Sequence, residues 1–279
     1  MIISTLVETF RWWRLWRPST SELDQARATH FEASSDPVPD QGWKRKVVLV
    51  TGRSDFSTNV LAPDQLGLLL QLQKALLLED NELIYQAFPF DGSVAAHFKH
   101  VSLWEKLSGG RLRVPVISMR NFWQWVLLVT STRYASDVAA VITRMLGAPQ
   151  GKDSTLLFVT GSLGTAMVLS AVPHLTARCR ISILSYGGVF GDVDGLDRIE
   201  SMLNLSAKGD RWSAIGSHWT SLFNKDSGAI TRASADGRLR QLCIVGPGHM
   251  AYLEDQAAVS MLIDEAKQLP GWSKELVHD

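Results

Sequence analysis

A serine stands in a turn of small residues directly after an apolar run. Residues 156–159 are apolar, and Thr160-Gly161-Ser162-Leu163-Gly164 follows. A sharp turn from strand to helix lifts a serine hydroxyl above the edge of a sheet, and the crowded backbone there requires small neighbours. The amide of Leu163 would then lie at a helix N-terminus, where it can donate to the oxyanion of a tetrahedral intermediate. Ser162 is therefore a candidate nucleophile; the other interpretation is an ordinary turn in which the serine caps a helix.

A histidine lies in a glycine-rich loop near the end of the chain. Residues 242–255 read Leu-Cys-Ile-Val-Gly-Pro-Gly-His-Met-Ala-Tyr-Leu-Glu-Asp, which predicts a strand, a loop that carries His249, and then a helix. The loop lacks the periodic apolar neighbours that are typical of a core position. His249 is a surface histidine or, together with Ser162, a general base that takes the proton of the serine hydroxyl.

These motifs resemble the α/β-hydrolase superfamily, whose nucleophile turn is usually written G-x-S-x-G. Here Thr160 replaces the first glycine. The base-bearing loop of the family comes last in the chain, as His249 does. The resemblance spans residues 44–270, and its specific content is three short motifs. It implies a Ser-Asp-His triad that works without a cofactor or a metal.

The resemblance places the acid at the end of a strand between Ser162 and His249. Residues 202–206 form a short, mainly apolar run, and Asp210 follows them, 48 residues after Ser162 and 39 before His249. Asp210 is the first choice, although it could merely form a turn. Asp192 and Asp194 follow the preceding predicted strand and are the alternatives. The aspartates of 192–197 lack the ligand spacing and terminal glutamate of a calcium-binding EF-hand loop, so we predict no metal site there.

A second oxyanion donor is expected from the loop after the first strand. That loop reads Thr51-Gly52-Arg53-Ser54, where the family often has His-Gly. The amide of Arg53 is our candidate for this donor.

The elements that must position these residues alternate along the chain. Strands are predicted at 47–51, 82–87, 155–160, 181–186, 202–206 and 241–245. Helices are predicted after Pro63, after a capping Ser136, over 163–178, and before Pro270. Repeated strand–helix units predict an α/β fold: a mainly parallel central sheet with helices on both faces, as in the α/β-hydrolases. This domain covers 44–279.

Residues 88–133 interrupt the alternation. They are rich in phenylalanine and tryptophan and stand where a simple unit needs only a short loop. Either they form a lid or insertion over the site, or they supply an extra strand, at 114–118, and a helix of the core.

Residues 1–43 form a separate N-terminal segment. Residues 2–17 predict an amphipathic helix with Glu8 and Arg11 on one side and an apolar face on the other, which consists of Ile2, Ile3, Leu6, Val7, Phe10 and Trp13. Tryptophans alternate with arginines over 10–17, which suits a lipid headgroup boundary. The helix either docks on the body of the protein or a second copy, or makes peripheral contact with a membrane surface. The proline-containing segment 18–42 is predicted to be a linker.

Composition excludes several classes of function. Lys plus Arg and Asp plus Glu number 28 each, so nothing in the net charge recruits nucleic acid. Two isolated cysteines make neither a disulfide framework nor a zinc site. Residues 48–56 lack the further glycines of a nicotinamide-binding loop, and 147–153 falls one residue short of a phosphate-binding loop. Without a signal peptide or a membrane-spanning stretch, the expected location is cytoplasmic, or associated with a membrane surface.

The sequence therefore predicts a serine hydrolase of small esters. The aromatic residues of 88–133 and the tryptophan-rich N-terminus favour apolar acyl groups. The alternative is a catalytically silent hydrolase fold that acts as a binding or membrane-associated module.

Overall fold

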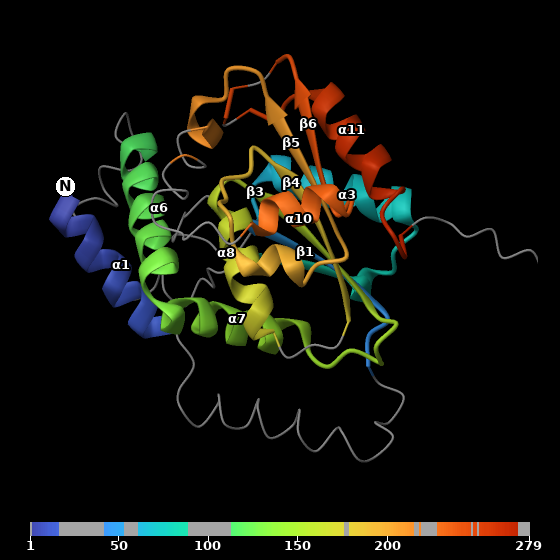
Figure 1. Ribbon diagram of the computed structural model, residues 1–279, viewed down its shortest axis with the longest axis horizontal. Helices are drawn as coiled ribbons and strands as arrows, with labels where there is room; N and C mark the ends of the chain where they lie inside the picture. Colours follow the sequence, from blue (N-terminus) through green and yellow to red (C-terminus); the bar gives the residue numbers. More distant parts are fainter. Residues whose placement is uncertain are drawn as a thin grey trace, which may run out of the picture.

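The structure is a computed structural model (Figure 1). It describes residues 2–16, 42–52, 61–88, 113–175, 179–214, 218, 228–246, 248–249 and 251–272. Of the N-terminal segment 1–43 it therefore describes residues 2–16 and 42–43, and of the segment 88–133 that interrupts the alternation it describes residues 88 and 113–133. The greater part of the predicted linker lies outside the described residues.

The described residues form one sheet of six strands, in which each neighbouring pair runs parallel. The strands are β1 (Arg45–Thr51), β2 (Leu83–Phe88), β3 (Thr155–Gly161), β4 (Arg180–Tyr186), β5 (Ser201–Ala207) and β6 (Leu239–Ile244). Their order across the sheet is β2-β1-β3-β4-β5-β6. The chain thus moves from β1 to one side and then crosses back to the other, so that the order reverses between β1 and β3.

Helices cover both faces of this sheet (Figure 1). They are α1 (Ile2–Trp16), α3 (Pro63–Leu76), α6 (Arg113–Thr130), α7 (Thr132–Leu146), α8 (Leu163–Ala171), α10 (Ala229–Ala235) and α11 (Gln256–Ala266). Short 3-10 helices occur at Asp80–Glu82, Val172–His174 and Asp194–Asp197. The predicted fold class, a mainly parallel α/β sheet with helices on both faces, is confirmed.

The core follows the two-residue period of the strands. Phe158 of β3 and its neighbour in register on β4, Ile183, face the layer that contains α7 and α8. The next residues, Val159 and Leu184, face the layer that contains α3 and α11. Because both faces are covered, every residue of β3 is buried and its middle, residues 156–159, is entirely apolar, as expected of a central parallel strand.

Three local expectations were wrong. Residues 114–118 form the start of helix α6, not a strand. Helix α7 begins earlier than predicted, because Ser131 rather than Ser136 accepts a hydrogen bond from a first-turn amide, that of Tyr134. Helix α8 ends at Ala171 instead of continuing to 178, since Pro173 cannot donate the hydrogen bond that another α-helical turn requires.

Helix α1 lies against α6 and α7 with its polar side inward. Thr5 and Thr9 are buried, the Glu8 carboxylate pairs with Arg120 of α6 at 3.0 Å, and the indole of Trp13 donates to Asp137 of α7 at 2.8 Å. A helix that docked through its apolar face, one of the two expectations for this segment, would have the opposite orientation. None of the described helices is long and apolar enough to cross a membrane.

Candidate functional site

The parallel sheet gathers the three predicted site residues at one edge. Ser162 follows β3, Asp210 follows β5 and His249 follows β6. The carboxyl ends of parallel strands meet at the same edge, and ligands of open α/β sheets bind there, at the point where the strand order reverses. Ser162 lies at that point, because β3 is the strand that pairs with β1 on the far side from β2.

The backbone at Ser162 is strained. Ser162 has φ 52° and ψ −126°, and Leu77 is the only other described residue besides glycine with a positive φ. This conformation costs on the order of 1–3 kcal/mol and persists where the surrounding structure imposes it. Here the surroundings are strand β3 on one side and helix α8 on the other. The turn is the sharp strand-to-helix connection that the sequence predicted around this serine.

Two glycines allow the turn to pack closely. A Cβ atom at Gly161 would lie 2.5 Å from the ring of Tyr186, and one at Gly164 would collide with the carbonyl oxygen of Val50. Neither position can accept a larger side chain without movement of its neighbours. Gly164 therefore brings the first turn of α8 directly onto the end of β1.

Thr160 stands where the family pattern has its first glycine, and the structure shows why a side chain fits there. Thr160 is fully buried, and its hydroxyl is 3.0 Å from that of Thr165, which is 2.8 Å from the hydroxyl of Ser185. These three hydroxyl groups satisfy one another beneath the turn. The threonine thus departs from the sequence pattern without altering the course of the backbone at Ser162.

The side chains of Ser162, His249 and Asp210 form a continuous hydrogen-bonded chain. Nε2 of His249 lies 2.8 Å from Oγ of Ser162. Nδ1 of the same ring lies 3.0 and 2.9 Å from the two carboxylate oxygens of Asp210. In this arrangement one ring nitrogen can accept the serine proton while the other donates to the carboxylate. The chain can therefore activate a hydroxyl for attack on an electrophilic carbon.

The Asp210 carboxylate is buried but well supplied with donors. The amides of Trp212 and Ser213 donate to Oδ1 at 3.1 Å each, and the hydroxyl of Tyr252 donates to Oδ2 at 2.9 Å. Burial alone would raise the pKa of Asp210, but the hydrogen bonds from His249, Ser213 and Tyr252 outweigh it and hold this pKa below its ordinary value. The group is thus a carboxylate at neutral pH and can orient the imidazole.

Sequence reasoning missed Tyr252. Its ring is almost fully buried, and its hydroxyl accepts from the amide of Ala207 at 2.6 Å while it donates to Asp210. Tyr252 thereby ties the residues after His249 to the end of β5. The tyrosine three residues after His249 was visible in the sequence, but its pairing with a residue 42 positions away was not.

The alternative acids have other contacts. Asp192 accepts from the amides of Gly228 and Ile230, at 2.6 and 2.8 Å, at the start of α10. Asp194 is exposed, and Asp197 pairs with Arg232 and Arg238. Across the described ranges, no group of three or more metal-ligating side chains comes together. The structure pairs His249 with Asp210.

Leu163, the first predicted oxyanion donor, is the first residue of α8. Its amide is one of the first-turn N–H groups that have no acceptor within their own helix. Gly52 packs onto it, since a Cβ atom at Gly52 would lie 2.7 Å from the Leu163 nitrogen. The loop after β1 therefore begins beside this amide. Arg53, the second predicted donor, lies outside the described residues.

No family model and no curated protein matches the sequence. Two solved structures share its general arrangement: a dienelactone hydrolase from Anabaena variabilis (14% identity, TM-score 0.42) and a dienelactone hydrolase-like promiscuous phosphotriesterase from metagenomic libraries (14% identity, TM-score 0.41). Each alignment covers 82% of this chain and 86% of the other.

Proposed function

We propose that this protein is a serine hydrolase that cleaves carboxylic esters through an acyl-enzyme intermediate. The observation that carries the proposal is the pair of contacts made by one imidazole, 2.8 Å to Ser162 and 2.9 Å to Asp210. The strained backbone of Ser162 supports it, because strain of this kind is maintained at sites where a side chain must be presented in one direction.

Acylation begins when Nε2 of His249 takes the proton from Oγ of Ser162. The oxygen attacks the ester carbon, and the amide of Leu163 donates to the oxyanion that forms. His249 then gives its proton to the leaving alkoxide as the carbon–oxygen bond breaks, which leaves an acyl group on Ser162. Asp210 keeps the imidazole in the required tautomer and stabilises its cation.

Deacylation repeats these steps with water in place of the serine. His249 takes a proton from water, the hydroxide attacks the acyl carbon, and Ser162 leaves with the proton that His249 returns. The products are a carboxylic acid and an alcohol. We propose apolar acyl groups as the substrate class, on the basis of the phenylalanine and tryptophan content of residues 88–133.

A fluorophosphonate probe tests the nucleophile. The wild-type protein should be labelled at Ser162, and Ser162→Ala should remain unlabelled and lose ester hydrolysis by a factor on the order of 10⁴ or more. Ser162→Ala removes one oxygen, so its thermal melt should match that of the wild type. A mutant that keeps more than about a tenth of the wild-type rate would exclude Ser162 as nucleophile. A wild-type protein that neither reacts nor hydrolyses esters would indicate the silent fold.

A panel of p-nitrophenyl esters graded by acyl length tests the substrate class. If apolar acyl groups are preferred, kcat/KM should rise from acetate to the medium-length acyl chains. A flat profile, or one that falls from acetate onward, would contradict the preference while leaving the proposed chemistry intact.

A further inference from the structure

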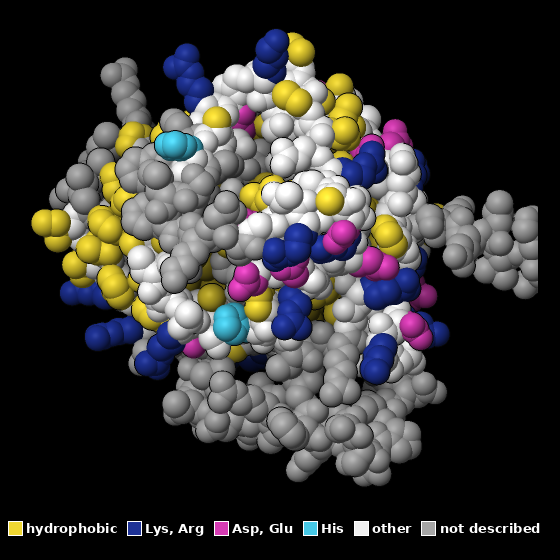
Figure 2. Space-filling model, in the orientation of Figure 1, with side chains coloured by type: hydrophobic (Ala, Val, Ile, Leu, Met, Phe, Trp, Pro, Cys, Tyr) yellow, Lys and Arg dark blue, Asp and Glu magenta, His cyan; other side chains and the backbone are white. Residues whose placement is uncertain are grey.

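Helix α1 presents an apolar face to solvent. Ile3 is 75% exposed, Val7 43% and Phe10 42%, whereas Glu8, the only acidic residue of the helix, is 8% exposed. In Figure 2 hydrophobic side chains gather at the left edge of the molecule, where Figure 1 places α1. This arrangement reverses the usual rule for a helix on a globular domain, whose apolar face turns toward the core.

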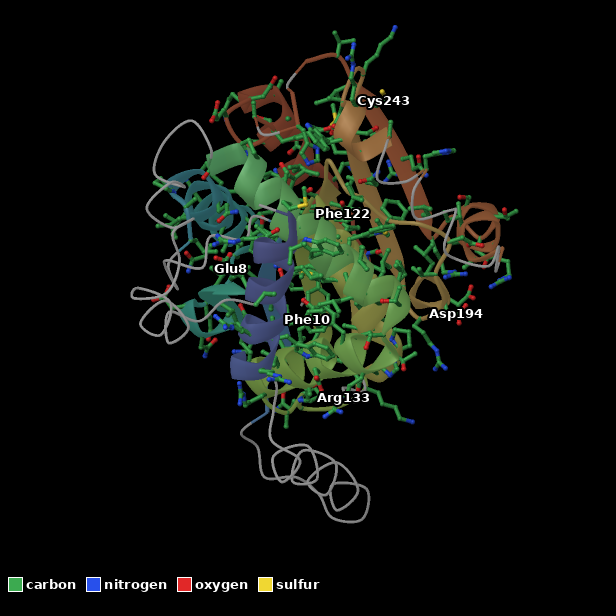
Figure 3. All side chains as sticks on the ribbon, turned by 90° about the vertical axis from the view of Figure 1, so that its left-hand side faces the viewer. Glu8, Phe10, Phe122, Arg133, Asp194 and Cys243 are labelled. Carbon is green, nitrogen blue, oxygen red and sulfur yellow. The ribbon has the colours of Figure 1, made fainter. Side chains whose placement is uncertain are left out.

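Helix α6 extends this face. It lies beside α1, and its Phe122 is 40% exposed (Figure 3). The ring of Phe122 is 5.1 Å from that of Trp123. We call the exposed side chains of Ile3, Val7, Phe10 and Phe122 the outer face of the α1–α6 pair. Exposed apolar side chains that gather on two neighbouring helices are a candidate interaction surface.

The charges near the outer face are basic. Arg11 and Arg14 are exposed, and on a projection with 100° per residue they share with Phe10, Ile3 and Val7 an arc of about 100°. Arg11 therefore lies at the edge of the apolar face and not opposite it, as the sequence pattern had suggested. Arg133, at the start of α7, is exposed as well and lies below Phe10 in Figure 3. Helix α6 contains no acidic residue, and Glu8 of α1 is paired with Arg120 beneath the face.

We propose that the outer face is a docking surface for an anionic lipid membrane. Apolar side chains flanked by arginines suit the boundary between acyl chains and negatively charged headgroups. A second copy of the chain is a poorer match, because two such faces would bring arginines together without exposed carboxylates from α1 or α6. Since α1 docks through Thr5, Glu8, Thr9 and Trp13, binding requires no detachment of the helix from the body.

Co-sedimentation of the full-length protein with vesicles tests this proposal. We expect the protein to pellet with phosphatidylcholine vesicles that contain phosphatidylglycerol and to bind vesicles of phosphatidylcholine alone far more weakly. Raising the ionic strength from about 0.05 to about 0.5 M should weaken the anionic binding, because the headgroup charge is then screened. No pelleting with the anionic vesicles at the lower ionic strength would overturn the proposal.

Two double variants separate the apolar from the charged contribution. Ile3→Ser with Phe10→Ser should lower the partition coefficient on anionic vesicles by tenfold or more, on the order expected when two exposed apolar side chains are lost. Arg11→Gln with Arg14→Gln should lower it about 25-fold, at roughly fivefold per arginine, and should weaken the preference for phosphatidylglycerol. If either variant binds like the wild type, the outer face is not the contact.

A matched control comes from α3, where Leu70 is 47% exposed and Lys74 is also exposed one turn later. Leu70→Ser with Lys74→Gln should bind vesicles like the wild type, and an equal loss of binding in this control would contradict the assignment.

Thermal melts show whether each variant is folded. If the Ile3 and Phe10 double variant is not folded, the single change Ile3→Ser takes its place. Sedimentation equilibrium tests whether a second copy of the chain occupies the outer face instead. A dimer that dissociates when Ile3 and Phe10 are changed, in a protein that does not bind vesicles, would overturn the membrane proposal. The inference does not depend on ester hydrolysis.

Discussion

Two carboxylates, Asp210 and Glu8, are buried in very different settings. Asp210 lies at the carboxyl edge of the sheet and accepts from two amides, a tyrosine hydroxyl and an imidazole. Glu8 lies between helices α1 and α6 and accepts from the guanidinium of Arg120. The first set of donors fixes the direction of a carboxylate that faces His249. The second fixes the side on which a helix docks and leaves an apolar face outside.

The comparison shows that a buried carboxylate can determine how neighbouring side chains are oriented as well as stabilise the fold. At the sheet edge, the polar network presents Ser162 through His249. At the N-terminus, the polar contacts of α1 present Ile3, Val7 and Phe10. The first region holds Ser162 in a strained conformation, and the second leaves apolar side chains exposed to solvent. In each region, replacing the buried carboxylate should reveal what that carboxylate contributes.

Asp210→Asn should produce the larger functional effect of the two. The amide would hold the wrong imidazole tautomer, so kcat should fall by a factor of about 10⁴. Asp192→Asn is the control: it alters the contacts of Asp192 at the start of α10 and should leave kcat nearly unchanged. Steady-state hydrolysis of an activated ester measures both. Should Asp192→Asn or Asp194→Asn cause the large loss while Asp210→Asn stays active, the acid has been misassigned.

Glu8→Ala should instead reduce stability and spare activity. It leaves Arg120, whose side chain is mostly buried, without the carboxylate that faces it, at a cost of about 3 kcal/mol in the free energy of unfolding. Ile3→Ala on the outer face of the same helix should change this free energy by less than about 0.5 kcal/mol. Urea unfolding measures the difference. Equal effects of the two substitutions would mean that α1 is not held by its polar side.

Tyr252→Phe should lower kcat much less than Asp210→Asn does, by roughly tenfold, because His249 and two amides still hold Asp210. The lost hydroxyl also leaves the buried Ala207 amide without its acceptor, which should cost about 2 kcal/mol of stability. Tyr186→Phe is a matched control, since the two rings are neighbours with centroids 6.3 Å apart.

The stability difference between Tyr252→Phe and the wild type should depend on pH. The pKa of Asp210 is lowered in the folded protein, so the stability that its hydrogen bonds contribute is present above the ordinary value of 3.8 and is lost as the pH falls through the lower folded value. The part of the Tyr252→Phe stability gap that comes from Asp210 should thus be constant from pH 7 to about pH 5 and narrow below about pH 4. Urea unfolding across this range measures it. A gap that widens on acidification would contradict the ionised state of Asp210.

The sequence predicted the sheet edge much better than the N-terminal helix pair. Short buried strands, the small residues around Ser162 and the glycine-rich loop at His249 are local signals, and the parallel sheet then requires their ends to meet. The orientation of α1 depends instead on Arg120 and Asp137, more than a hundred residues away, which pair with Glu8 and Trp13. The spacing of apolar residues along the helix cannot reveal such distant partners. For the same reason Tyr252 and the hydroxyl chain beneath Thr160 emerged only from the structure.

Helix α6 illustrates a further limit. Residues 113–118 contain valine, isoleucine and proline, which favour a strand or a turn in isolation, yet they begin a helix of 18 residues. The helix that they begin packs against α1 and α8, which are distant from it in the sequence. The region could be recognised as an interruption of the strand–helix alternation, but its secondary structure was set by contacts distant in the chain.

The most direct test of the proposed chemistry is the mass of the protein during turnover of an activated ester. Rapid acid quench followed by intact mass spectrometry should show the addition of one acyl group, and peptide mapping should locate it on Ser162. The same experiment should give a burst of one equivalent of alcohol per protein molecule if deacylation is the slower step. Hydrolysis that proceeds while Ser162 stays unmodified, with the acyl group found on the exposed Cys243 or on no residue at all, would contradict the account.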